Sequence, residues 1–249
     1  GAGFYEVMQP SVFLLLVAAL ADFFDGALAR AIRAESDFGV VFDTLADAIS
    51  FGVAPPLLVL KALSLEQGTL YSLFVAASAL IYSLCGVLRL VRFNVKANEA
   101  KGNLELEADQ KKHFTGLPIP AAAAVVASSN LFFLAPQVVD AWPLSLDQRA
   151  WILGGVMMAI GYLMVCRLKF PSLKVLRFKI LSFRLVFLTG VGAIVLLYGL
   201  LNFFALVFMA LSWLYVLLAL TLSLIRFFAG KKSKTLEEFE PEPEEHDAP

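Results

Sequence analysis

The sequence predicts an all-α protein, a polytopic bundle of transmembrane helices. Hydrophobic residues make up 59% of its 249 residues and charged residues 16%, whereas soluble domains average about 45–50% apolar and about 25% charged residues. Windows of about 20 residues give seven apolar spans, which leave no room for a separate soluble domain. The basic residues are segregated between alternate loops, as the positive-inside rule requires.

The seven predicted spans follow one another with short connections. They lie at about 10–31, 38–60, 69–91, 117–135, 150–166, 185–203 and 205–227. Residues 1–229 are therefore expected to form one transmembrane domain that carries the site. Residues 230–249 contain seven of the 21 acidic residues and are expected to form a charged, disordered cytoplasmic tail.

The basic residues predict the orientation of the chain. With these span ends, 18 of the 20 Lys and Arg residues lie on one side, and only Lys61 and Arg149 lie on the other. The first side is therefore expected to be cytoplasmic. Seven spans with a cytoplasmic C-terminus would place Gly1 outside, so we expect one more span before the first residue of this sequence.

Four acidic residues lie within predicted spans: Asp22, Asp25, Asp43 and Asp47. An ionised carboxylate in hydrocarbon costs about 3 kcal/mol on insertion scales, so such residues indicate a functional site. Structural pairing with basic residues is the alternative. It is disfavoured because few basic residues lie in or near the spans.

The spacing places the acids on one face of each helix. Asp22, Asp25 and Gly26 recur at i, i+3 and i+4, while Asp43 and Asp47 are four residues apart. The first helix is expected to end near residue 30 and the second to begin near residue 37. The two would then be antiparallel neighbours whose acidic faces meet. Carboxylate ligands favour a hard divalent cation such as Mg²⁺ or Mn²⁺.

Small and basic residues continue the first acidic face. Gly26 and Ala29 leave room for a flat ligand such as a nucleobase or ribose, and Arg30 is placed to meet a phosphate. Close helix packing is the alternative for the two small residues. Interfacial snorkelling is the alternative for Arg30.

The stretch from Asp22 to Asp47 resembles the signature of the CDP-alcohol phosphotransferases, D-x-x-D-G-x-x-A-R-x8-G-x3-D-x3-D, at every fixed position. The resemblance implies a membrane-embedded enzyme with two metal ions and a homodimeric assembly. It implies that Asp22, Asp25 and Asp43 are metal ligands and that Asp47 is the general base, with a possible metal contact. It also implies a CDP pocket formed by Asp22, Gly26, Ala29, Arg30 and Gly39.

Downstream segments indicate the acceptor alcohol. LADAISFGVAPPLL, LRLVRFNV, FTGLPIPAAAA and CRLKFPSLK resemble the branch of the family that uses serine. The expected reaction joins CDP-diacylglycerol to L-serine and releases CMP. The predicted acceptor or phosphate residues are Arg89, Arg92, Asn94 and Ser50, with membrane anchoring as the alternative for both arginines. Pro55 and Pro56 are expected to bend their helix.

Two alternatives stay open at this stage. Glycerol-3-phosphate, inositol phosphate or choline would use the same chemistry. An ion-coupled transporter would use the acids as ion sites, but it is expected to show an internal repeat, and no second acidic motif follows residue 47. We expect membrane lipids as surroundings, no nucleic-acid partner, and a site facing the cytoplasm of a bacterial inner membrane.

Overall fold

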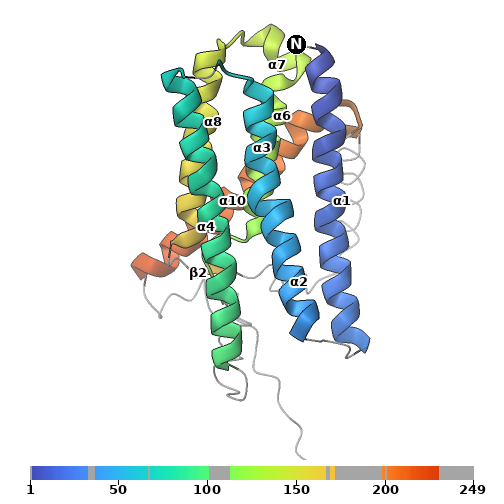
Figure 1. The fold of residues 1–249 in the computed structure, drawn as a ribbon, viewed down its shortest axis with the longest axis vertical. Coiled ribbons are helices and arrows are strands. Elements are labelled where there is room, and N and C mark those ends of the chain that lie inside the picture. The colour runs from blue at the N-terminus through green and yellow to red at the C-terminus, as the bar shows by residue number, and fades with distance from the viewer. Residues whose placement is uncertain are drawn as a thin grey trace, which may run out of the picture.

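The computed structural model describes residues 2–32, 37–66, 68–100, 113–166, 169–171, 198–199 and 201–229, and Figure 1 shows a bundle of long helices. The α-helices are α1 (Ala2–Ile32), α2 (Asp37–Asp47), α3 (Ala54–Leu63), α4 (Leu70–Ala100), α6 (Ile119–Leu134), α7 (Pro136–Ala141), α8 (Leu146–Val165) and α10 (Phe204–Ala229). A π-helical turn, η1 (Ala48–Val53), joins α2 to α3. This architecture confirms the predicted all-α polytopic bundle.

The only strands among the described residues are two of three residues each. β1 (His113–Thr115) pairs antiparallel with β2 (Lys169–Pro171), with Phe114 opposite Phe170. This small ladder ties the segment before α6 to the segment after α8.

Among the described residues, five helical stretches are long and apolar enough to cross a membrane: Gly3–Asp22, Val41–Leu63, Leu70–Val95, Leu146–Val165 and Phe204–Ser223. A sixth apolar helix, α6, has 16 residues, fewer than the roughly 20 that usually span a bilayer. Each corresponds to a predicted span. The predicted span 185–203 lies outside the described residues except at its end.

The first span differs from the prediction in position. Helix α1 begins at Ala2 rather than near residue 10, with Pro10 inside it, and its apolar stretch ends at Asp22. Apolar residues such as Phe4 and Val7 extend the stretch, and proline is tolerated within membrane helices. Asp25 therefore lies beyond this span rather than inside it, and Asp22 marks its end. Charges cost less at that depth than at the bilayer centre.

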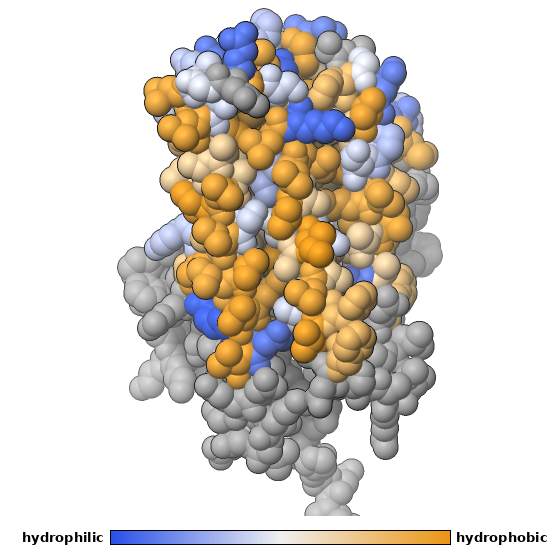
Figure 2. All heavy atoms as spheres, viewed as in Figure 1, coloured by the Kyte–Doolittle hydropathy of each residue, from blue (hydrophilic) through white to orange (hydrophobic). Residues whose placement is uncertain are grey.

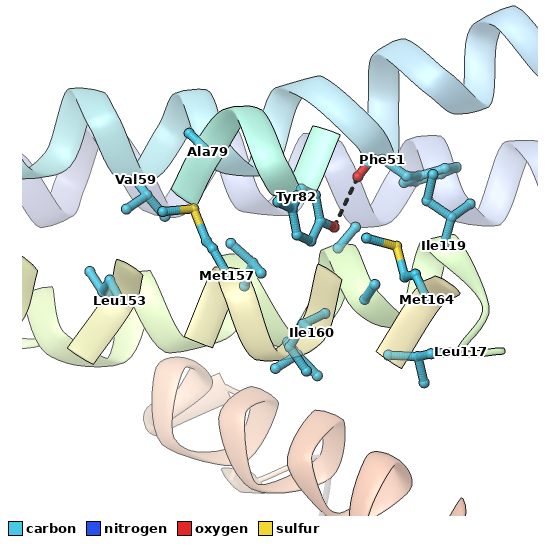
Figure 3. Close-up of a cluster of buried hydrophobic side chains, with 14 of the residues drawn as sticks. Phe51, Val59, Ala79, Tyr82, Leu117, Ile119, Leu153, Met157, Ile160 and Met164 are labelled. Atoms are coloured by element: carbon cyan, nitrogen blue, oxygen red, sulfur yellow. Dashed lines mark hydrogen bonds between the residues drawn. The ribbon is translucent and has the colours of Figure 1, made fainter. Parts of the chain in front are cut away.

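The core of the bundle forms where α8 packs lengthwise against α4, while α6 contacts α1, α3, α8 and α10. Gly154 on α8 permits this approach, because a Cβ atom there would overlap the ring of Phe74. Met157 and Ile160 are fully buried on the same helix, and Figure 3 shows Met157 directed toward Val59.

The outer surface of the bundle is apolar. Exposed side chains on α4 include Leu73, Leu80 and Leu84, each more than 60% exposed. Figure 2 shows hydrophobic residues over the middle of the molecule and polar residues gathered at the end near α7. Such a band is what a protein surrounded by lipid requires.

Candidate active site

The two helices that carry the predicted acids lie as the spacing predicts. Helix α1 ends at Ile32 and α2 begins at Asp37, and the two helices run in opposite directions (Figure 1). The side chains of Asp25, Ala29 and Arg30, and the surroundings of Gly26, lie outside the described part of the structure. The roles predicted for these four residues stay predictions.

The acidic faces of α1 and α2 meet. The carboxyl groups of Asp22 and Asp47 are hydrogen-bonded to each other, and Asp43 is near enough to act electrostatically on Asp47. Asp22 and Asp47 are half-buried, whereas Asp43 and Gly39 are exposed. The described acids of α2 therefore become more exposed from Asp47 toward the start of the helix.

The chemistry of this cluster fits a hard divalent cation, because its donors are carboxylate oxygens and a cation could replace the hydrogen bond between Asp22 and Asp47. The described residues do not by themselves assemble three His, Cys, Asp or Glu side chains at metal-binding geometry. Asp25, the fourth predicted ligand, has no described side chain. Asp22, Asp43 and Asp47 are the predicted ligands whose side chains the structure describes, and their role as ligands stays a prediction.

Asp47 stands at the start of the π-helical turn η1. Its i→i+5 pattern is visible where the N–H of Ala54 donates to the carbonyl of Ile49, and π-turns often occur at functional sites. Two hydroxyl groups of α4 hold the turn. Tyr82 donates to the carbonyl oxygen of Phe51 at 3.1 Å, and Ser83 donates to that of Gly52 at 2.9 Å (Figure 3 shows the first bond).

The two arginines predicted for the acceptor have different surroundings. Arg92 donates through Nη1 to the carbonyl of Val165 at 2.9 Å and through Nη2 to that of Met164 at 3.2 Å. A cationic side chain at the C-terminal end of a helix can donate hydrogen bonds to the last carbonyl groups, which lack a partner within the helix. Its positive charge also interacts favourably with the negative end of the helix dipole. Arg92 thus caps α8. This contact uses two of the five N–H donors of the guanidinium, and the predicted role of Arg92 as an acceptor or phosphate residue stays a prediction.

Arg89 lies beside the acids instead. Its guanidinium acts electrostatically on Asp47, and its buried Nε has no hydrogen-bond partner among the described residues. Tyr215 of α10 also lies near Arg89. Sequence reasoning missed Tyr215, because it lies near the middle of an apolar span and belongs to no motif.

The remaining predicted acceptor residues lie next to α2. Asn94 donates through Nδ2 to Oγ1 of Thr44 at 2.9 Å, which ties α4 to the residue after Asp43. Ser50 is half-buried within η1. The structure therefore gives Asn94 a contact that positions α2, and it places Ser50 one turn beyond Asp47.

Together, the apolar bundle and its paired carboxylates define a membrane protein with an acidic site at one end of its spans. The family model of the CDP-alcohol phosphatidyltransferases matches residues 5–167. The chain belongs to this family. The match includes the stretch from Asp22 to Asp47 and Arg89, and it ends before α10.

Three curated relatives show the range of similarity. The CDP-diacylglycerol–serine O-phosphatidyltransferase of Bacillus subtilis is 32% identical over 68% of this chain and 79% of its own length. The protein of the same name from Helicobacter pylori strain J99 is 30% identical over 70% of this chain and 65% of its own length. The archaetidylserine synthase of Methanothermobacter thermautotrophicus is 32% identical over 66% of this chain and 59% of its own length. The chain thus spans less than two thirds of the latter two relatives.

Proposed function

We propose that this protein transfers the phosphatidyl group of CDP-diacylglycerol to L-serine and releases CMP, at a divalent-metal site on the cytoplasmic side of the membrane. The observation that carries the proposal is the meeting of Asp22 and Asp47 from adjacent helices, with Asp43 and Arg89 beside them. The names of the relatives support serine, because serine is common to them while the lipid part differs.

Asp47 is the proposed base. A carboxylate within hydrogen-bond reach of the serine hydroxyl can take its proton, and the serine oxygen then forms a bond to the phosphorus that bears the diacylglycerol. The bond from that phosphorus to the bridging oxygen of the pyrophosphate breaks, and CMP leaves with the electron pair. The acyl chains stay in lipid while serine enters from water, because the acids lie at the ends of their spans.

Asp22, Asp43 and Asp47, with Asp25, are the residues proposed to hold the metal. A bound divalent cation would neutralise the pyrophosphate and stabilise the charge on CMP. Arg89 would bind the carboxylate of serine, because a guanidinium matches a carboxylate in bidentate geometry. The homodimer that the family resemblance implies stays a prediction.

The acceptor is tested by a screen with CDP-diacylglycerol and the purified protein in nanodiscs, following CMP release. Serine is expected to give the fastest release among serine, glycerol-3-phosphate, inositol phosphate and choline. Faster release with any other acceptor would contradict the assignment of serine. The family-level chemistry would survive that result.

Replacing Arg89 by Lys is expected to raise KM for serine about tenfold or more, because lysine keeps the charge but loses the planar fork. KM for CDP-diacylglycerol is expected to change little. Steady-state kinetics with each substrate varied in turn checks the prediction.

Arg92→Lys is the matched control for this prediction. The cap on α8 would weaken, so the melting temperature is expected to fall without a selective rise in KM for serine. A selective rise in Arg92→Lys with a wild-type KM in Arg89→Lys would reverse the assignment of the two arginines.

The orientation is tested by single cysteines after replacement of Cys85 and Cys166. Ala97 lies past the end of the span Leu70–Val95, and the exposed Gln137 lies on α7 at the opposite end of the bundle (Figure 1). A cysteine at Ala97 is expected to react with an impermeant thiol reagent only in inside-out vesicles, and one at Gln137 only in right-side-out cells. The opposite pattern would place the site outside.

A further inference from the structure

We propose that Tyr82 and Ser83 are positioning residues, whose hydroxyl groups hold η1 as a π-turn and thereby keep Asp47 directed at Asp22. The inference rests on the proposed role of Asp47 as the base. It concerns residues outside the Asp22–Asp47 signature, and it assigns them a part in the reaction rather than in packing alone.

The sequence of η1 and α3 leaves carbonyl groups that lack a backbone donor. In an α-helix, the carbonyls of Phe51 and Gly52 would accept from the N–H groups of residues 55 and 56. Both of those residues are prolines, which have no N–H. In the π-register, Phe51 would face Pro56 and again lack a donor, whereas Gly52 would face Leu57, which has an N–H. Unpaired buried carbonyls are costly, and Tyr82 and Ser83 supply the missing donors.

The π-turn also sets which way the acids face. Asp43, Asp47, Phe51, Pro55 and Val59 recur every four residues, and they become steadily more buried along the chain, from the exposed Asp43 to the fully buried Val59. An α-helix turns about 40° past a full circle in four residues. A continuous α-helix would thus rotate Asp43 about 160° away from Val59.

A π-turn winds less per residue, because its hydrogen bonds span one residue more. The π-turn therefore cancels much of the rotation of about 160° that a continuous α-helix would produce. As a result, the acids share a face with the packed residues of α3. If η1 relaxed to an α-turn while α3 kept its packing, Asp47 would rotate away from α1. The orientation of Asp47 therefore depends on the turn that Tyr82 and Ser83 hold.

The packing around η1 allows α4 to serve this role. Gly86 lies close to Gly52, since a Cβ on Gly86 would be 3.5 Å from the Gly52 Cα and 3.1 Å from the Ile119 side chain. Tyr82, Gly86 and Arg89 follow the i, i+4, i+7 pattern, so they lie on one face of α4. This face thus carries the hydroxyl group that bonds to η1, the glycine that lies close to Gly52, and the guanidinium beside Asp47. Tyr82 itself is fully buried.

The test compares kcat and KM of purified Tyr82→Phe/Ser83→Ala with those of the wild type. We expect kcat to fall about 10- to 100-fold, as a displaced catalytic group would cause, with KM for CDP-diacylglycerol unchanged. Ser78→Ala is the matched control, because the buried Ser78 hydroxyl donates to the Phe74 carbonyl within α4 and does not hold η1. Ser83→Thr keeps a hydroxyl and is expected to keep kcat.

A second variant separates positioning from stability. Pro55→Ala/Pro56→Ala restores the N–H donors and lets the helix close into the α-register, so kcat is expected to fall although the melting temperature does not. Wild-type kcat in this variant, or in Tyr82→Phe/Ser83→Ala, overturns the proposal. If the wild type does not use serine as an acceptor, the proposed function is wrong. The kcat values of the wild type and the variants are then compared with the acceptor that the screen identifies.

Discussion

Asp47→Asn is expected to lower kcat by about 10²- to 10⁴-fold, the usual contribution of a positioned general base. The amide keeps the size of the side chain and its place at the start of η1, but it cannot accept the proton of the serine hydroxyl. KM for CDP-diacylglycerol is expected to change less than kcat. Steady-state CMP release by the purified variant measures both.

Two further variants make this result specific to the site. Asp43→Asn removes a proposed metal ligand, so we expect it to raise the metal concentration needed for half-maximal rate more than it lowers kcat at saturating metal. Asp140→Asn removes an exposed acid on α7, at the opposite end of the bundle. It is expected to leave both kcat and the metal concentration for half-maximal rate unchanged. Wild-type turnover in Asp47→Asn would exclude Asp47 as the base.

Removal of divalent cations is expected to abolish CMP release, and added Mg²⁺ or Mn²⁺ should restore it. Asp22 and Asp47, with Asp43 beside them, place acidic groups at the proposed binding site of an anionic pyrophosphate, and without a cation that approach is electrostatically unfavourable. Titration of the chelated protein with each metal, following CMP release, checks the prediction.

The same titration has a readout that does not need turnover. A ligand that binds only the folded protein raises its melting temperature, so Mg²⁺ or Mn²⁺ should raise it for the wild type and less for Asp22→Asn. Full activity in excess chelator would remove the metal from the proposed reaction.

The bundle and the meeting of the acids follow from patterns that the sequence carries directly. Apolar windows located the helices, and the spacing of Asp22 on α1 and of Asp43 and Asp47 on α2 was enough to predict that two faces would meet across a short turn. Both patterns are local, and helix geometry alone converts them into positions in space.

The rest of the site depends on contacts between distant segments. Pro55 and Pro56 predicted a bend, but nothing nearby indicates that Tyr82 and Ser83 would supply the missing donors. An arginine at a span end has the same pattern whether it caps a helix, as Arg92 does, or lies beside an acid, as Arg89 does. The predicted span begins near residue 150, whereas α8 begins at Leu146. The difference arises because the polar residues of the capping box, Ser145 and Gln148, interrupt the apolar window.

The most direct test is to identify the lipid product. Purified protein in nanodiscs that contain CDP-diacylglycerol is supplied with L-serine and Mg²⁺ or Mn²⁺, and CMP and phosphatidylserine are quantified by mass spectrometry. We predict equal amounts of CMP and phosphatidylserine from the wild type, and 10²- to 10⁴-fold slower formation of both by Asp47→Asn. CMP release without phosphatidylserine, or equal formation by Asp47→Asn, would contradict the proposed transfer.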